Sequence, residues 1–404
     1  MPKVLIFAPI VGRGGLHLCV ETMLKGYRDY APEDWQFSIL GHDYDEIGLP
    51  IQYGYPLTKL ESDVPLPQHP FLFPYLLRNA DHFMDQLREV VDEQKPDLVM
   101  VYGGWWIARA KRWDIPTPMV CFLPDFATSQ GVDLGQLLND HFEYSAQLLS
   151  KRADFTVYSS DYHREHAVSR YHFPIQKTAV VHHSSDFVLQ NGLKVSKAEG
   201  RRVRKKLLLP EKYVLAFHPM GHKDPQTVLR AQQFARMHSD KVPSLVFAGI
   251  GTDGFTDLKN RRTRRMLEEV HAHLDYDFFA TGYVDEGDIG GLFANAVVSI
   301  NASMSEGDLS GATLTSFVTK TPHIYSNLPV YQLRLNETLG LSFEVGDYEQ
   351  LGKHIVDVCE YPEAAERRAL RAFKWAQTRT LRDVINEYLE IFRKVIDEPP
   401  SHSN

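Results

Sequence analysis

The stretch "AVVSINASMSEGDLSGATLTSF" (296–317) passes from an apolar run into a turn rich in glycine and serine, after which a helical pattern resumes. Such a strand–turn–helix step leaves several backbone N–H groups without partners, and the helix dipole adds partial positive charge. A diphosphate fits there, and the small residues Ser310 and Gly311 would let it approach the backbone closely. Glu306 repels phosphate but can accept hydrogen bonds from sugar hydroxyls. Two interpretations stay open for this stretch alone: a sugar-diphosphate site, and an ordinary capped helix start with a dipole-favoured glutamate.

The same alternation of apolar runs and helical patterns surrounds this stretch in both directions. In the second half of the chain, strands are predicted at 213–219, 244–250, 277–283, 296–302 and 323–327. In the first half, they are predicted at 3–9, 36–41, 97–103, 118–123, 154–160 and 177–183. Helical patterns at 16–31 and 79–94 lie between strands of the first half. The alternation predicts an α/β protein with two doubly wound parallel sheets that face each other across a cleft, where ligands bind at strand C-terminal ends.

Three segments interrupt the alternation. Residues 42–75 are rich in proline, tyrosine and aspartate, which predicts a long surface excursion. Residues 184–210 form a linker followed by a basic helix. The segment 363–396 is strongly helical, with a break near "TRT" (378–380), where β-branched threonines and a polar cluster weaken the helix.

The composition excludes several classes of function. The 404 residues carry a formal net charge of −8, which argues against a general binder of nucleic acid or membrane surfaces, since both need a basic face. No apolar run approaches the length of a membrane span, and "MPKVLIFAP" (1–9) is predicted to be a first strand rather than a secretory signal. The three cysteines are scattered and predict neither a disulfide nor a zinc site. A reducing cytoplasm is the expected location.

The neighbours of the opening stretch show a resemblance to a known family. "FFATGYVDEGDIGGLFANAVVSINASMSEG" (278–307) resembles the donor site of retaining GT-B glycosyltransferases in the glycogen-synthase-like group, glycosyltransferase family 4. "PIVGRGGLHLCVETMLKG" (9–26) is similar to the N-terminal glycine loop and first helix of that family. "YHFPIQKTAVVHHSSDF" (171–187) is similar to its interdomain crossing, and "LVFAGIGTDG" (245–254) to its second C-domain strand.

The resemblance implies a GT-B fold with a defined order of parts. Residues 1–187 would form the N-terminal, acceptor-side domain, and residues 188–375 the C-terminal domain that binds the nucleotide sugar. Residues 376–396 would form a helix that packs back on the N-terminal domain, and 397–404 a flexible tail.

The resemblance also implies roles for individual residues. Glu306 would bind hydroxyls of the donor sugar, and Lys223, in "HPMGHKDP" (218–225), would neutralise charge on the leaving diphosphate. Asp125, in "FLPDF" (122–126), would lie near the sugar and the acceptor. The residues expected to contact the nucleotide diphosphate are Gly14, Gly15, His222, Gly282, Tyr283, Ser305, Gly307, Asp308, Leu309, Ser310, Gly311 and Thr315. Backbone amides of residues 308–311 would hold the phosphates, and residues 282 and 283 would lie beside the base.

The chain departs from the family pattern at three places. The family has a second glutamate that binds ribose, but the equivalent position here is Leu314 or, with a one-residue shift, Thr315. The "GR" before the lysine is missing, and His218 or His222 would be a poor substitute for a guanidinium fork. The strand "CFLPD" (121–125) lacks the family's histidine. Ribose recognition and the N-terminal part of the site are therefore open.

Other conspicuous patterns are weaker evidence for sites. The adjacent histidines of "VVHHSSD" (180–186) point to opposite faces of a strand, so a metal pair is not expected. The basic runs at 201–206 and 261–265 are expected to be solvated helix faces, given the acidic total. "GGWW" (103–106) fits either stacking on an acceptor sugar or loop packing. "GIGTDG" (249–254) lacks the spacing of a dinucleotide fingerprint.

We therefore expect a retaining, metal-independent hexosyltransferase that uses a nucleotide-diphosphate sugar as donor and needs no other cofactor. The acceptor would be a hydroxyl of a sugar, a glycan or another molecule, and neither nucleic acid nor a membrane segment is involved. Two alternatives stay open, a non-catalytic sugar- or nucleotide-binding protein of the same fold and a sugar-nucleotide epimerase. The sequence leaves the donor sugar, the base, the acceptor, the linkage and the oligomeric state undefined.

Overall fold

The computed structural model describes residues 1–9, 15–42, 54–62, 75, 77–102, 107–123, 136–189, 196–217, 221–249, 261–270 and 278–398. The chain divides into two compact units. Among the described residues, the first unit contains those up to His183 and those from Leu381 onward, and the second contains Ser184–Thr380.

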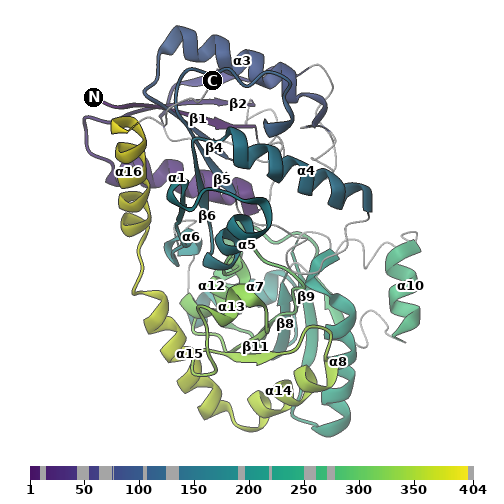
Figure 1. Cartoon of the computed structure of the whole chain (residues 1–404). Coiled ribbons are helices and arrows are strands. Elements are labelled where there is room, and N and C mark those ends of the chain that lie inside the picture. Colours follow the sequence, from purple (N-terminus) through teal and green to yellow (C-terminus); the bar gives the residue numbers. More distant parts are fainter. Residues whose placement is uncertain are drawn as a thin grey trace. The chain divides into compact units, whose positions relative to one another are not determined.

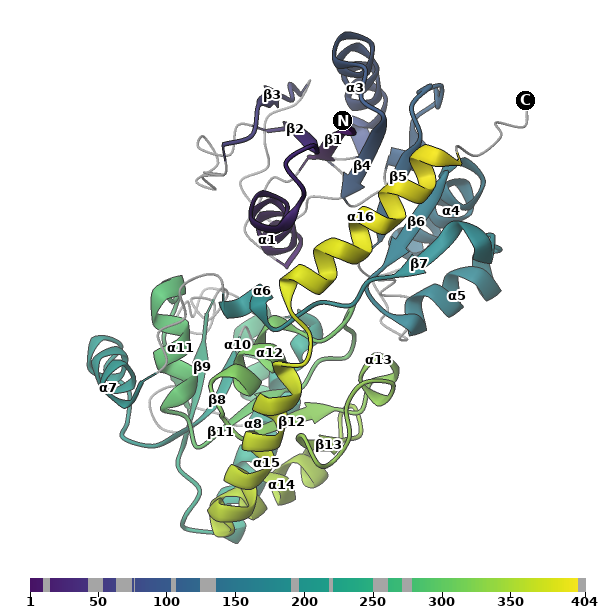
Figure 2. The same cartoon turned by 90° about the vertical axis from the view of Figure 1, so that its left-hand side faces the viewer.

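The first unit is built on a sheet of seven parallel strands in the order β3-β2-β1-β4-β5-β6-β7 (Figures 1 and 2). These are β1 (Lys3–Ala8), β2 (Gln36–Gly41), β3 (Leu57–Lys59), β4 (Leu98–Tyr102), β5 (Met119–Leu123), β6 (Phe155–Tyr158) and β7 (Thr178–Val180). The helices are α1 (Gly15–Tyr30), α3 (Ala80–Gln94), α4 (Gln136–Arg152), α5 (Asp161–Tyr171) and α16 (Leu381–Asp397), with short 3₁₀ turns η1 (Ile107–Arg109) and η3 (Ile175–Lys177). The central strands are buried on both faces, which explains their unbroken apolar runs.

Side chains on successive strand residues face opposite helical layers. Phe7 of β1 belongs to the core that α3, α4 and α5 cover. Tyr102 of β4 faces the other way, toward Tyr27 of α1 and Tyr388 of α16. The helices α1 and α16 lie side by side (Figure 2). A Cβ atom at Gly26 of α1 would lie 2.6 Å from Cδ1 of Ile385, so glycine is what permits this close approach.

The second unit repeats the plan with six parallel strands in the order β10-β9-β8-β11-β12-β13. The strands are β8 (Tyr213–Phe217), β9 (Ser244–Ala248), β10 (Phe278–Ala280), β11 (Val298–Asn301), β12 (His323–Ser326) and β13 (Leu341–Phe343). The helices are α6 (Asp186–Leu189), α7 (Lys197–Lys206), α8 (Pro225–His238), α10 (Arg261–Glu269), α11 (Glu286–Ala294), α12 (Gly311–Val318), α13 (Pro329–Gln332), α14 (Tyr348–Glu360) and α15 (Pro362–Ala376), with the 3₁₀ turn η4 (Gly221–Lys223).

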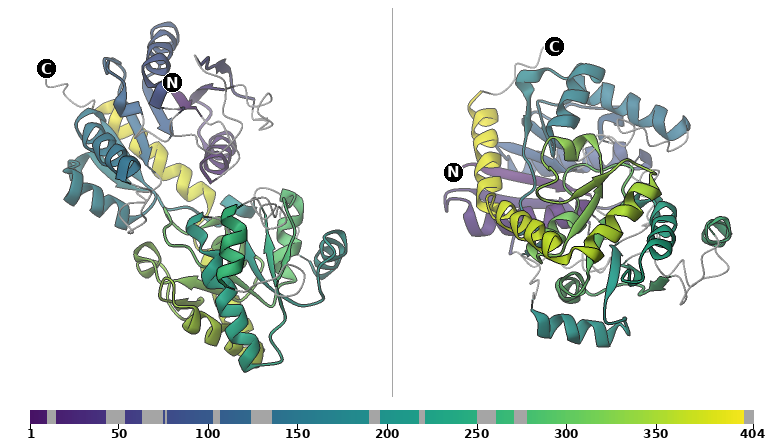
Figure 3. Two further views of the ribbon diagram at one scale, coloured as in Figure 1. Left: turned by 90° about the vertical axis from the view of Figure 1, so that its right-hand side faces the viewer. Right: turned by 90° about the horizontal axis from the view of Figure 1, so that it is seen from below.

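Two apolar clusters sandwich this second sheet. One joins the strands to α8, α10 and α14, and the other joins them to α7 and α11. Figure 3 shows these helices around the sheet from two further directions. In both units the strand order reverses beside the first strand, between β1 and β4 and between β8 and β11. Doubly wound sheets bind ligands outside the C-terminal ends of strands at such a switch point, which directs attention to the loops after β8 and β11.

The predicted doubly wound α/β architecture is confirmed, and a strand or its core lies within each of the eleven predicted strand segments. The helix break near residue 378 is also confirmed, because α15 ends at Ala376 and α16 begins at Leu381. The edge strands β3 and β13 were not predicted, since three residues are too few to show a period. In the segment 42–75, predicted as a surface excursion, residues 57–59 instead pair with β2.

Within the described ranges, none of the helices combines the length and the apolar character that crossing a membrane requires.

Candidate functional site

The loops that follow β8 and β11 meet at the switch point of the second sheet. These strands are neighbours, with Val214 paired to Val298. The N–H of Met304 donates to the carbonyl of His222 at 2.7 Å, which ties the loop after β11 to the turn η4. As a result the Lys223 ammonium donates to Oε1 of Glu306 and forms an ion pair with it. Their side chains are 17% and 11% exposed, so the pair is largely shielded from solvent.

The Glu306 carboxylate is held ionised by its neighbours. Burial raises its pKa, but the charges of Lys223 and His222 and the hydrogen bonds from Lys223 and Ser303 outweigh burial, and the pKa lies below its ordinary value. Ser303 Oγ donates to Oε1 at 2.5 Å, and Nδ2 of Asn301 donates to the same oxygen at 3.2 Å. An ionised carboxylate in this position is an acceptor for ligand hydroxyls.

The start of α12 offers two backbone donors. Ser310 is the N-cap, and its Oγ accepts from the N–H of Thr313 at 3.1 Å. The Ser310 N–H itself donates to the hydroxyl of Tyr331 at 3.3 Å. Within the described part of the chain, the N–H groups of Gly311 and Ala312 have no acceptor. Gly311 is exposed, and a Cβ atom there would meet nothing within 4 Å, so the space beside this residue is open.

An arginine from the loop after α13 fixes the turn before α12. The side chain of Asp308 is fully buried, and Arg334 Nη1 donates to its Oδ1 at 2.5 Å. The guanidinium in turn lies over the ring of Trp375, 5.5 Å from its centroid. Because the negative charge of Asp308 is neutralised in this way, it opposes an approaching anion much less than a free carboxylate would.

The structure places the remaining predicted residues as follows. Gly282 and Tyr283 follow β10; Gly282 has a positive φ of 71°, and its carbonyl accepts from the N–H of Gly249 at 3.0 Å. Tyr283 is 43% exposed, and Ser305 is buried. Gly307 and Leu309 lie in the turn between β11 and α12. Gly15 is the first residue of α1, in the first unit. Gly14 and Asp125 lie outside the described residues.

The positions aligned with the family's ribose-binding acid carry no substitute carboxylate. Leu314 is buried. Thr315 is also buried, and its hydroxyl donates to the carbonyl of Gly311 at 2.6 Å within α12. The hydroxyl proton of Thr315 is therefore engaged in a hydrogen bond within α12.

Sequence analysis missed several residues that build this region, among them Asn301, Tyr331 and Arg334. Asn301 is the last residue of the buried strand β11, and a polar residue at the C-terminal end of a strand is a detectable signal at a switch point. Tyr331 and Arg334 lie 21 and 26 residues from their partners Ser310 and Asp308, and no local pattern marks that contact.

The basic run of α7 does more than face solvent. Arg202 and Lys206 both pair with the buried carboxylate of Asp288 on α11, in a contact that ties the two helices together. His182, from the adjacent histidine pair, contacts the Ser159 carbonyl and the Asp161 carboxylate, each at 3.1 Å. In the described ranges no three His, Cys, Asp or Glu side chains are grouped to hold a metal ion.

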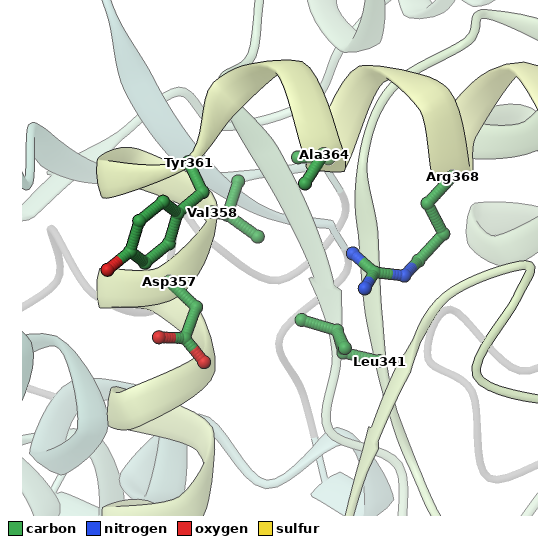
Figure 4. Close-up of a pocket in the computed structure, with 7 residues that line it drawn as sticks. Leu341, Asp357, Val358, Tyr361, Ala364 and Arg368 are labelled. Atoms are coloured by element: carbon green, nitrogen blue, oxygen red, sulfur yellow. The ribbon is translucent and has the colours of Figure 1, made fainter.

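A cavity of about 290 Å³ lies elsewhere in the second unit, between α14, α15 and β13 (Figure 4). Its lining combines apolar side chains with Asp357 and Arg368, and Nε of Arg368 donates to the carbonyl of Glu337 at 2.9 Å. None of the described residues that the sequence predicts for the site lines this cavity. The loops after β8 and β11, which combine an ion pair with open amides, are therefore the better candidate.

No protein-family model matches the chain, and no curated protein matches it in sequence. Solved structures do match over nearly the whole length. Sucrose-phosphate synthase from Thermosynechococcus elongatus is 15% identical, with a TM-score of 0.76, over 98% of this chain and 100% of that one. HepE of Anabaena, in complex with UDP-glucose, is 15% identical, with a TM-score of 0.73, over 98% and 99%.

A third match is a Listeria monocytogenes protein provisionally assigned as a UDP-N-acetylglucosamine 2-epimerase, which is 12% identical, with a TM-score of 0.64, over 98% of this chain and 97% of that one. At such identities these matches show the fold alone. The two doubly wound units, with the last helix returning to the first unit, have the GT-B fold. Because a synthase and a protein assigned as an epimerase share it, a function has to be argued from the site.

Proposed function

We propose that the chain is a glycosyltransferase that moves a sugar from a nucleotide diphosphate to an acceptor hydroxyl with retention of configuration and without a bound metal ion. The observation that carries the proposal is the Lys223–Glu306 ion pair beside the two unpaired amides that open α12. This places donors for an anion next to an acceptor for hydroxyls. The fold shared with a protein that binds UDP-glucose supports the donor class, and the resemblance to family 4 supports retention.

The diphosphate and the sugar of the donor would bind to different groups of the protein. The diphosphate would take the N–H groups of Gly311 and Ala312 and the ammonium of Lys223. The Glu306 carboxylate, relieved of part of its contact with Lys223, would accept hydrogen bonds from sugar hydroxyls. The positive charge that a divalent ion supplies in other transferases would come here from Lys223 and the helix N-terminus.

In the transfer step, the bond between the anomeric carbon and the diphosphate oxygen breaks, and a bond from that carbon to the acceptor oxygen forms on the same face. The acceptor proton moves to an oxygen of the departing diphosphate, so no strong protein base is needed. Lys223 and the α12 amides stabilise the charge that develops on the leaving group. Asp125 is proposed to orient the acceptor.

One observation favours a second candidate, a non-catalytic binder of nucleotide sugars. Leu314 and Thr315 provide no carboxylate for the ribose, so a contact expected of an active family member is missing. An epimerase of the same fold is a third possibility.

A nucleotide screen followed by product analysis separates these candidates. We expect one of UDP, GDP, ADP or dTDP to raise the melting temperature, because a ligand present at 100 times its Kd stabilises the native state by about 2.7 kcal/mol. The matching sugar nucleotide, incubated with a library of hydroxyl acceptors, should give a glycosylated product with the anomeric configuration of the donor. Binding without any product would favour the non-catalytic candidate, and a changed sugar without an acceptor would favour the epimerase. No stabilisation by any nucleotide would refute the proposal.

A glycine substitution tests the open space before α12. Gly311→Ala should weaken binding of the nucleoside diphosphate by about tenfold, because the added methyl group projects into the space proposed for the phosphates. Stability should hold or rise slightly, since alanine favours the helix and the methyl group meets no protein atom. Calorimetric titration and thermal melts measure the two effects.

Gly287 provides the matched control. It lies in the first turn of α11, and a Cβ atom there also meets nothing within 4 Å. Its flanking Glu286 and Asp288 make that helix start unsuited to an anion. Gly287→Ala should leave nucleotide affinity unchanged, and equal affinity losses in the two variants would show that the α12 amides do not hold the ligand.

A further inference from the structure

The carboxamide of Asn301 lies between the two halves of the candidate site. Asn301 is the last residue of β11 and is 3% exposed. Its Nδ2 group lies 3.2 Å from Oε1 of Glu306, 2.9 Å from Oγ of Ser310 and 2.7 Å from the hydroxyl of Tyr331. It also lies 3.5 Å from Oγ1 of Thr313, so the group has two hydrogens for four acceptors, which compete for it.

The charge of Glu306 sets the orientation of this carboxamide. Ser303 Oγ lies 2.6 Å from Oδ1 of Asn301 and 2.5 Å from Oε1 of Glu306, and its one proton is shared between these two oxygens. If the carboxamide were turned over, its oxygen would face the Glu306 carboxylate at 3.2 Å, and the two would repel. Nδ2 therefore points at Glu306, and Asn301 acts as a neutral donor to that charge.

Tyr331 of α13 supports Asn301 from inside the unit. Its side chain is fully buried, and its hydroxyl accepts from Nδ2 of Asn301 and from the N–H of Ser310. The same hydroxyl lies 3.4 Å from Oγ1 of Thr313. One phenol oxygen thus joins the end of β11 to the residue that caps α12.

We propose that Asn301 is a positioning residue that holds the Glu306 carboxylate and the start of α12 in one geometry, and that Tyr331 holds Asn301 in turn. The inference rests on the proposed function, because it names the residues that hold the proposed donor site in place. The position requires a neutral donor. It stabilises the Glu306 charge and brings no second negative charge close to the diphosphate.

The deciding experiment is the pH profile of Asn301→Asp, which keeps the shape of the side chain and replaces the donor by an acid. Two buried carboxylates at hydrogen-bond distance cannot both ionise readily, so one should hold a proton at low pH and lose it as the pH rises. We expect kcat/KM relative to wild type to fall about tenfold between pH 6 and pH 8. A merely structural defect would lower activity equally at all pH values.

The charged and titratable groups around this position bear on that expectation. Lys223 and His222 of the turn η4 act on the neighbouring Glu306 carboxylate, and Lys223 is paired with it. Tyr331 faces it from α13. His323 of β12 lies behind Thr313, with Nε2 3.1 Å from Oγ1, and burial lowers its pKa to about 3, so it stays neutral. Lys223 is already committed to Glu306 and His323 is neutral, so neither offers the new carboxylate an uncommitted positive charge.

Asn327 gives the matched control for the acid substitution. Its Nδ2 also donates to a glutamate, Oε1 of Glu344 at 2.7 Å, but at a more exposed position of the same unit. Asn327→Asp should keep the wild-type pH profile. A wild-type profile in Asn301→Asp as well would overturn the inference.

A second pair of variants decides the matter if Asn301→Asp does not fold. Tyr331→Phe removes only the hydroxyl that holds Asn301 and should lower kcat about tenfold while the donor KM stays within about threefold. Tyr325→Phe is its control, because that ring packs on Tyr331 with centroids 5.5 Å apart and its hydroxyl bonds to none of these residues. Equal kcat in both variants would overturn the inference. A wild-type chain that neither binds nucleotides nor turns over a donor would instead refute the proposed function.

Discussion

Replacing Glu306 by glutamine is expected to lower turnover about 100- to 1,000-fold, the range found when a preorganised electrostatic group is removed from a transition state. Glutamine keeps the size of the side chain but cannot accept from sugar hydroxyls with a full negative charge. The variant should remain folded, with some loss of stability because Lys223 loses its partner. Steady-state kinetics with the donor identified by the nucleotide screen would measure the effect.

Glu360 of α14 is a suitable control for this substitution. It too pairs with a lysine, Lys241 at 2.5 Å, and accepts from a serine, Ser239 at 2.5 Å, but it lies outside the loops of the site. Glu360→Gln should keep wild-type turnover. Full activity in Glu306→Gln would remove this carboxylate from the chemistry and leave the proposal without its sugar-binding group.

Replacing Lys223 by methionine should lower the free energy of unfolding by about 3–5 kcal/mol near neutral pH, the usual result of leaving one partner of a buried ion pair uncompensated. The sign of the pH dependence should also reverse. In the wild type the pKa of Glu306 lies below its ordinary value of 4.5, so its contribution to stability is present above pH 4.5 and is lost as the pH falls through the lowered pKa.

Without Lys223, burial becomes the main influence on Glu306 and should raise its pKa above 4.5. The charged form then costs stability, and that cost grows as the pH rises through the raised pKa. Urea unfolding at pH 5 and pH 8 should therefore show a larger deficit at pH 8. A deficit that is equal at both pH values would contradict the assigned pairing.

The double variant Lys223→Met/Glu306→Gln completes this test. It leaves no unpaired buried charge, so it should recover most of the stability that Lys223→Met loses, although it stays inactive. Stability no better than that of Lys223→Met would show that the loss comes from packing around residue 223 rather than from the stranded carboxylate.

The parallel sheets were predictable because their buried strands form unbroken apolar runs such as "VLIFA" (4–8), which periodicity exposes directly. The start of α12 was predictable for a similar reason, since Ser310 and Gly311 mark a cap locally. The ion pair of Lys223 with Glu306 was not. The two residues are 83 positions apart, and they meet only because β8 and β11 are neighbours in the sheet order.

The residues that hold the site in place were even harder to predict from the sequence. Tyr331, in the short helix α13, accepts from the N–H of Ser310, and Arg334, in the loop after α13, pairs with Asp308. The sequence there shows no sign of either contact. Buried polar groups require hydrogen-bond partners, but this requirement does not identify which distant residue provides the partner. The resemblance to a family could place Glu306 and Lys223, yet it carried no information on residues that the family does not share.

The passage of the chain from α15 into α16 has a consequence for how such proteins can be recombined. Because α16 completes the first unit, that unit is encoded by two gene segments, one on each side of the segment for the second unit. A single crossover between two homologues would therefore set α1 from one parent against α16 from the other. At Gly26, where a methyl group would clash with Ile385, a chimera of parents that differ at these positions would need this side chain to shift and should be less stable.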